Sequence, residues 1–343
     1  MKTTTKFINH ASVLISDGDI SVLSDPWYSG NAFHKGWNLL HETNQSEIEK
    51  LLETVTHIWI SHEHPDHFSI SFFKNYSRKI REYSIKILFQ NTIDKRVLRF
   101  LKSQGLEVQE LEFNKSINLS DNYRVKCIKD GFYDSALLIE SYGEKILNLN
   151  DCEINNQSRL DEVFEITGQV DVLLTQFSFA AWKGGLNNKK WRDEAAQEKI
   201  NTMNLQTERF RPKFLIPFAS FVYFSNKENF YLNDAANKPE HLKEKLRKHS
   251  GKLIIMAPND VLGGKNESLN EIRALNFWQE KYQKINTHKL NNFLTSDLDT
   301  IRNSFETYCN RIEKNNNLFI IKIIRLISPI RAFKPITIQI TDL

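Results

Sequence analysis

Residues 57–67 read HIWISHEHPDH, an apolar run of strand-forming residues followed directly by a polar loop. Three histidines and one aspartate fall within the six residues from His62 to His67. Core packing does not explain so many ligand-type side chains at the end of a buried strand. We therefore interpret the segment as a metal-binding loop, in preference to a chance polar loop.

The spacing within this loop suits two metal ions. On extended backbone His62 and His64 point to the same side, so both can bind one ion. Asp66 and His67 can turn toward a second ion, whereas Glu63 points away. A carboxylate beside imidazoles suits Zn, Fe or Mn, and two such ions about 3.5–4 Å apart activate a water molecule between them. We expect one or two divalent metal ions here.

The composition is that of a packed globular protein. Of 343 residues 40% are hydrophobic, and the formal net charge of +4 is too small to predict a nucleic-acid partner. Three scattered cysteines, without a C-x-x-C pair, predict a reducing, cytoplasmic setting. The first ten residues, MKTTTKFINH, lack an apolar core, so neither a signal peptide nor a transmembrane segment is expected.

Short β-type runs alternate with helical stretches up to residue 260, which predicts an α/β fold. Strands are expected at 6–15 and 20–24, joined by the hairpin signal Asp17-Gly18-Asp19, and a helix at 46–53 with Ser46 as its cap. Further strands are expected at 86–89, 107–111, 124–128, 136–141, 145–149, 170–174, 214–217 and 252–256, and further helices at 93–104, 189–208 and 239–248.

The pattern changes after residue 260 to longer helical stretches, at 269–282 and 297–314. We predict a catalytic domain over residues 1–260 and a helical elaboration with an apolar tail over 261–343. The tail segment 318–327, LFIIKIIRLI, is about half the roughly 20 residues that span a bilayer. We favour a buried strand or helix; the alternative is a basic amphipathic segment on a membrane surface or a partner.

The H-x-H-x-D-H motif at His62, His64, Asp66 and His67 resembles that of the metallo-β-lactamase superfamily. The resemblance implies a four-layer αβ/βα sandwich with both metals at the edge between two sheets. It places Asp151, directly after strand 145–149, where the family has a bridging carboxylate. Asp25, which follows strand 20–24, resembles the aspartate that orients a histidine ligand, although an Asp-Pro turn explains it as well.

A narrower resemblance covers residues 6 to about 260. The strings Asp25-Pro26-Trp27, GWNLLHE (36–42), KILN (145–148), Asp151-Cys152 and Pro217-Phe218-Ala219 are similar to the metallo-β-lactamase part of the CMP-N-acetylneuraminate hydroxylases and related nucleotide-sugar N-acetyl hydroxylases. Those enzymes also carry a Rieske iron–sulfur domain, whose ligands this chain lacks. An oxygenase built on this chain would therefore need an external electron donor such as a ferredoxin.

Two family histidines have no counterpart here, because no histidine lies between His67 and His241. Asp130 or Asp134 is the candidate oxygen ligand in place of the first histidine. Asn226 is the candidate in place of the second, although an amide oxygen would bind a metal weakly. Oxygen ligands in place of imidazole shift the preference from Zn toward Fe or Mn.

Five further residues are candidates for contact with a small anionic substrate: His10, Trp37, Lys183, Tyr223 and Lys227. His10 is equally compatible with strand packing, and Trp37 with an anchored aromatic loop. Lys183 precedes a Gly pair whose backbone amides could hold a phosphate, although that pair is a weak signal.

The leading hypothesis is a metal-dependent hydrolase, in which a hydroxide held by the metal attacks a phosphorylated or nucleotide-linked sugar derivative. Asp66, His67 and Asp151 would be its catalytic residues. One alternative is an iron-dependent oxygenase component that hydroxylates an N-acetyl sugar nucleotide. The other is a non-catalytic binding protein whose metal site has decayed, as the two missing histidines indicate.

Overall fold

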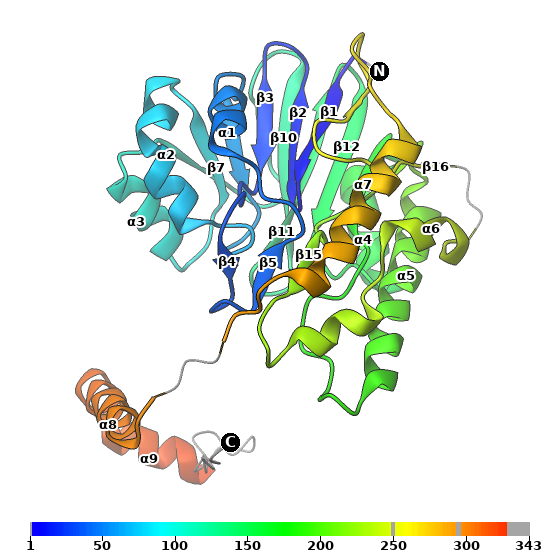
Figure 1. Cartoon of the computed structure of the whole chain (residues 1–343). Coiled ribbons are helices and arrows are strands. Elements are labelled where there is room, and N and C mark those ends of the chain that lie inside the picture. Colours follow the sequence, from blue (N-terminus) through cyan, green and yellow to red (C-terminus); the bar gives the residue numbers. More distant parts are fainter. Residues whose placement is uncertain (1, 248–250, 293–295, 328–343) are drawn as a thin grey trace. The chain divides into compact units, whose positions relative to one another are not determined.

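The computed structural model describes residues 2–247, 251–292 and 296–327 (Figure 1). The chain divides into two units, Met1–Asn292 and Phe293–Leu343. The larger unit extends beyond the boundary expected at residue 260, because Trp278 and Tyr282 of the next helix are buried in its core.

Two seven-stranded sheets form the larger unit. The first has the order β17-β1-β2-β3-β6-β7-β8, antiparallel from β17 to β3 and parallel from β3 to β8. Its strands are β1 (Thr4–Asn9), β2 (Ser12–Ser16), β3 (Ser21–Ser24), β6 (His57–Ile60), β7 (Lys86–Gln90), β8 (Val108–Leu111) and β17 (Val261–Leu262).

The second sheet has the order β16-β14-β13-β12-β11-β10-β9, antiparallel from β9 to β12 and parallel from β12 to β16. Its strands are β9 (Ser116–Asn118), β10 (Tyr123–Asp130), β11 (Asp134–Ser141), β12 (Glu144–Asn150), β13 (Val172–Gln176), β14 (Phe214–Phe218) and β16 (Lys252–Leu253). A small third sheet pairs β15 (Val222–Phe224) with β5 (Trp37–Leu39) and β4 (Asn31–Ala32).

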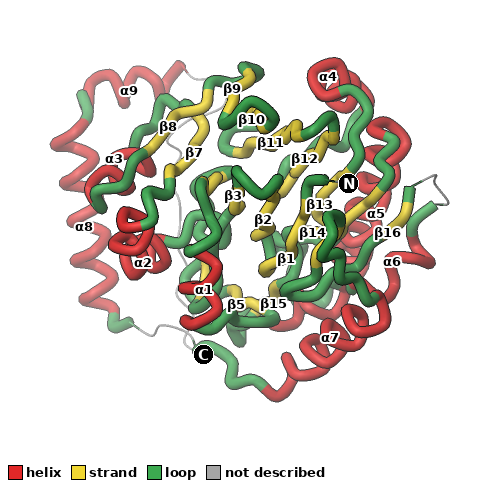
Figure 2. Tube along the Cα trace, turned by 90° about the horizontal axis from the view of Figure 1, so that it is seen from above, coloured by secondary structure: helices red, strands yellow, loops and turns green. Residues whose placement is uncertain are grey.

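Helices cover the outer faces of both large sheets. The helices of this unit are α1 (Gln45–Leu52), α2 (Ile70–Glu82), α3 (Arg96–Ser103), α4 (Gln157–Thr167), α5 (Lys189–Phe210), α6 (Pro239–Lys245) and α7 (Glu271–Lys284), with short 3-10 turns at Phe230–Ala235 and Ile285–Thr287. Figure 2 shows α2 and α3 outside the first sheet and α4 and α5 outside the second. The predicted four-layer sandwich is thus confirmed.

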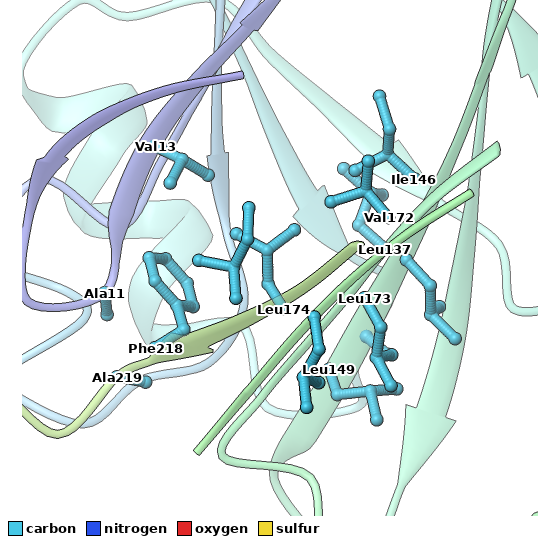
Figure 3. Packing of buried hydrophobic residues seen from close by; sticks show 14 of the residues in the cluster. Ala11, Val13, Leu137, Ile146, Leu149, Val172, Leu173, Leu174, Phe218 and Ala219 are labelled. Carbon is cyan, nitrogen blue, oxygen red and sulfur yellow. The ribbon is translucent and has the colours of Figure 1, made fainter. Parts of the chain in front are cut away.

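The main core lies between the two sheets. Apolar side chains of the first sheet, such as Val13, meet side chains of the second, such as Leu137, Leu174 and Phe218 (Figure 3). Because strands β3, β6 and β7 are parallel, and β12 and β13 likewise, their carboxyl ends gather at one edge of this core. Polar loops that leave those ends are therefore brought together.

Several elements differ from their predicted bounds. The stretch 6–15 is two strands, β1 and β2, with Asn9 paired to Ser12 across a tight turn. Helix α1 is capped by Asn44 rather than Ser46, since the Asn44 side chain accepts the N–H of Glu47 and Glu47 completes the capping box. Helices α2 and α4 were not predicted at all. Helix 239–248 was expected to end at Lys248, which lies outside the described residues.

The smaller unit contains α8 (Leu298–Asn315) and α9 (Leu318–Ile327). Neither helix has a buried side chain, which differs from the buried tail segment that the sequence predicted. Residues 328–343 of the tail lie outside the described part of the chain. Among the described residues, no helix has the length and apolar content needed to cross a bilayer.

Candidate metal centre

The motif loop leaves strand β6 at Ser61, and both sheets fix this residue. The carbonyl oxygen of Ser61 accepts hydrogen bonds from Nε2 of Gln90 (2.8 Å), at the end of β7, and from Oγ of Ser135 (2.6 Å), in β11 of the other sheet. Such bonds across the interior hold the start of the loop in one position before any ligand side chain is considered.

Asp25, at the end of β3, organises the loop from beneath. Its buried carboxylate accepts the N–H and the Oγ–H of Ser61, both at 2.7 Å, and is also bonded by Nδ2 of Asn150. Nδ1 of His67 lies 2.9 Å from Asp25 Oδ2 and donates to it. A proton on Nδ1 leaves the lone pair of His67 on Nε2, which is the arrangement of a metal-binding histidine oriented by a carboxylate.

Three groups of ligand-type side chains surround His67. They are His62, His67 and Asp151; His62, His64 and Asp134; and His10, Asp66 and His67. Within each group one ligand atom per residue lies within 4.8 Å of the others. Nε2 of His67 is 3.2 Å from Oδ2 of Asp66 and 3.3 Å from Oδ2 of Asp151, while Nε2 of His62 is 2.8 Å from Nδ1 of His64.

The donor set fits a divalent cation. Among the described residues, three buried atoms of this cluster form no hydrogen bond: Asp66 Oδ1, His67 Nε2 and Asp134 Oδ1. Burial of such atoms is costly unless a partner satisfies them, and bound cations would satisfy all three. Imidazole nitrogens mixed with carboxylate oxygens are ligands for Zn, Fe or Mn.

The electrostatics of the cluster point the same way. Burial, reinforced by His67, lowers the pKa of His62 to about 3, so its imidazole is neutral and able to bind a metal. Burial and then the charge of Asp151 raise the pKa of Asp134 to about 6. Burial disfavours a charged His67, but the carboxylates of Asp66 and Asp151 outweigh it and raise the pKa of His67 well above its usual range. Crowded carboxylates thus attract positive charge to this point.

His10 faces the cluster as a donor rather than as a lone pair. The backbone N–H of Phe221 donates to Nδ1 of His10 at 3.2 Å, so the proton of a neutral His10 resides on Nε2. Nε2 lies 3.4 Å from Oδ2 of Asp66. This tautomer gives His10 an N–H directed at Asp66, which orients the carboxylate and leaves its other oxygen for a cation.

A family model described as a β-lactamase superfamily domain matches residues 4–181. The chain belongs to the metallo-β-lactamase superfamily. Cytidine monophosphate-N-acetylneuraminic acid hydroxylase of Danio rerio is 28% identical over 263 residues, which are 71% of this chain and 43% of that protein. The chain therefore spans less than half the length of that relative.

Solved structures agree on the fold. A diiron β-hydroxylase from Streptomyces venezuelae superposes with a TM-score of 0.52 at 15% identity, over 76% of this chain and 54% of that one. A metallo hydrolase from Ignicoccus hospitalis gives 0.52 at 13% identity, over 76% and 97%. At such identities the likeness extends to the fold alone, and that fold is the metallo-β-lactamase fold expected from the motif.

A pocket of about 770 Å³ opens beside the cluster of this metallo-β-lactamase domain. Ligand-type side chains of the cluster line it: His64, Asp66, Asp134 and Asp151. Aromatic and basic side chains line much of the rest, including Phe33, Trp37, Phe179, Trp182, Lys183, Lys199, Phe224 and Tyr231, and Glu153 and Glu228 are acidic members of the same lining. Of the substrate-binding candidates taken from the sequence, Trp37 and Lys183 line this pocket.

Other sequence candidates lie elsewhere. Asp130 is paired with Arg159 (Oδ1 to Nε, 3.0 Å) and belongs to none of the three groups. Oδ1 of Asn226 accepts the N–H of Glu228 at 3.1 Å in a local turn. The hydroxyl of Tyr223 is 2.9 Å from Nδ1 of His288.

Asn226, Tyr223 and Lys227 are outside the pocket lining, as is His10 beneath Asp66. Asn226, the candidate for the second missing histidine, thus uses its side-chain oxygen within its own loop.

Sequence reasoning missed three amides and one lysine. Gln90, Asn150 and Gln176 hold Ser61, Asp25 and Asp151 respectively, with Gln176 Nε2 at 3.0 Å from Asp151 Oδ1. Each amide is the last residue of its strand and follows an apolar run, in KILFQ, EKILNLN and VLLTQ, and that position was a usable signal. Lys199 lies in the long helix α5, where nothing in the sequence distinguishes it from other lysines.

Proposed function

We propose that this chain is a metal-dependent hydrolase that acts on a phosphorylated or nucleotide-linked sugar derivative. The observation that carries the proposal is that Asp66 Oδ1, His67 Nε2 and Asp134 Oδ1 are buried without a hydrogen bond, in a cluster whose members His64, Asp66, Asp134 and Asp151 line a large pocket. A site without a cation would leave these atoms unsatisfied, so their arrangement supports metal binding and argues against a decayed site.

We assign the residues to two adjoining positions. His62, His64 and Asp134 would hold one ion, Asp66 and His67 the other, and Asp151 would bridge them. A bound divalent cation supplies a Lewis acid that lowers the pKa of water toward about 7. Asp25 would orient His67, and His10 would orient Asp66.

The pocket walls support the substrate class. Aromatic rings such as Trp37 and Trp182 suit the flat faces of a base or a sugar, and Lys183 and Lys199 suit phosphate groups. The similarity to cytidine monophosphate-N-acetylneuraminic acid hydroxylases also favours a nucleotide-linked sugar. Acidic residues of the cluster would repel such a substrate until cations neutralise them, so binding of metal would precede binding of substrate.

The second candidate function is an iron-dependent oxygenase component. It is favoured by Asp134, whose carboxylate takes a position where an imidazole was expected, because oxygen ligands suit iron better than zinc. Relatives named as hydroxylases point in the same direction. This reaction would need oxygen and electrons delivered by a separate protein such as a ferredoxin.

One experiment separates the two functions. The protein is stripped with a chelator, reloaded with Zn, Mn or Fe, and incubated with cytidine monophosphate-linked sugars and with an activated phosphodiester, both without oxygen or reductant. Hydrolysis that the chelator abolishes and a metal restores supports our proposal. Turnover that requires oxygen, a reductase and a ferredoxin together supports the oxygenase instead. Failure to bind any metal would favour the non-catalytic reading.

A further inference from the structure

Helix α9 presents an apolar surface that no described residue of its own unit covers. Leu326 is 85% exposed and Phe319 71%, and no side chain of the helix is buried. An uncovered run of large side chains on this scale marks a binding surface in a folded protein.

The two charges of α9 lie on one side of the helix. Because a helix turns about 100° per residue, Lys322 and Arg325 are neighbours on its surface. The opposite side carries Ile320, Ile323, Ile324 and Ile327. Lysine and arginine at the border of an apolar face keep their charged ends in water while their stems lie along it, which is the form of helices that rest in a membrane surface.

The charge of the surrounding sequence selects the partner. Residues 314–341 contain five basic residues and no aspartate or glutamate. Helix α8 differs, since it carries acidic residues such as Glu306 and Glu313 among its basic ones. A second copy of α9 would bring like charges together without acidic partners, whereas an anionic surface complements them.

The length of α9 sets its orientation. Ten residues of helix extend only about 15 Å, half of the roughly 30 Å hydrocarbon layer. We propose that α9 is an interfacial helix that docks this chain on anionic membranes, lying in the plane of the surface with its isoleucine face in the acyl region. This inference is independent of the reaction that the metal centre catalyses.

The test is co-sedimentation of the full chain with phosphatidylcholine vesicles, with and without phosphatidylserine, at low and high salt. The double variant Lys322→Gln with Arg325→Gln removes both charges of α9. The matched control is Arg99→Gln with Lys102→Gln, which removes two exposed charges at the same spacing from α3. A third variant, Ile320→Gln with Ile327→Gln, replaces two exposed residues of the isoleucine face and tests the apolar contribution.

We expect binding to phosphatidylserine vesicles that weakens with salt, and unchanged binding by the α3 control. Neutralising α9 should weaken binding roughly 30-fold, at about fivefold per basic residue. The apolar variant should also lose binding. Absence of binding, equal binding to pure phosphatidylcholine, or equal loss in the α3 control would overturn the proposal. Light scattering without vesicles provides a further check. A dimer of the wild-type chain that dissociates in the apolar variant would also overturn the proposal, since a second copy would then cover the apolar face.

Discussion

Nδ1 of His67 lies 2.9 Å from Oδ2 of Asp25, a residue 42 positions earlier in the chain. Both side chains are completely buried. The contact joins the loop after β6 to the end of β3, and it fixes which nitrogen of His67 carries the proton. A histidine that could rotate or exchange tautomers would bind a cation less tightly. The metal affinity expected of His67 therefore depends on Asp25, which is not itself a candidate ligand.

Asp25→Asn tests that dependence. The amide keeps the shape but loses the charge that holds the His67 proton, so metal affinity should fall by about 10–100-fold. Chelator competition measures the affinity. Asp17→Asn is the control, because Asp17 also accepts backbone N–H groups but does so in the hairpin turn. Equal affinity in Asp25→Asn and wild type would contradict the orienting role.

Changing His62 and His64 together to alanine removes two imidazoles from one position of the cluster. We expect metal content per chain to fall by at least about half, with the circular dichroism spectrum retained, because the sheets do not need the ion to close. Elemental analysis gives the stoichiometry. The exposed pair His34 and His241, changed to alanine in the same way, should leave it unaltered. Undiminished metal content in the first variant would refute the assignment.

Asp130 and Asp134 are four residues apart in sequence but face different partners. Asp134→Ala should weaken metal binding, because it removes a charged oxygen near His62. Asp130→Ala should leave metal affinity intact. It should instead lower the free energy of unfolding, because it removes the carboxylate that pairs with the partly buried guanidinium of Arg159. Titration with metal and thermal unfolding distinguish the two. Asn226→His should not tighten metal binding. A higher metal affinity in this variant would mean that residue 226 lies close enough to the cluster to bind the metal.

Asp134 also predicts a pH dependence of the metal-free protein. Its pKa is about 6 in the folded chain against an ordinary value of 3.8. Between these values the folded state holds a proton that the unfolded state has lost, so the stabilisation contributed by this group is complete below about pH 4 and is lost as pH rises through about 6. The decline contributed by this group is up to about 3 kcal/mol.

Asp134→Asn should lack that contribution, which urea unfolding of both proteins across this pH range would reveal. Saturating metal should abolish this pH dependence in the wild-type protein, because a cation stabilises the charged carboxylate of Asp134. Parallel pH profiles for the two metal-free proteins would show that Asp134 is not the titrating group.

Lys199 tests the substrate class. Lys199→Gln should raise KM for a phosphorylated substrate by about tenfold with little change in kcat, since a lysine that lines the pocket aids binding of a phosphate more than the chemical step. Lys190→Gln, on the exposed surface of the same helix, is the matched control. An unchanged KM would show that Lys199 does not contact the phosphate of the substrate.

Local sequence determined the motif loop and the class of the fold. The alternation of strands and helices depends on side-chain periodicity, and the ligand density of residues 57–67 needs no distant information. The bounds of α1 show the limit of such reasoning. Asn44 and Ser46 are both good caps with a glutamate three residues later, and only the folded chain shows that Asn44 is the cap, because its side chain accepts the N–H of Glu47.

Tertiary structure decided which polar residues meet. Asp130 and Asp134 are equivalent in sequence, but β10 and β11 form a hairpin that directs one toward Arg159 and the other toward His62. The direction of the His10 lone pair depends on the backbone of Phe221, 211 residues away. The sequence by itself therefore determined that a metal centre of this family is expected. The set of side chains that completes it was decided by strand order, because ligands at one sheet edge are neighbours only after the sheets have formed.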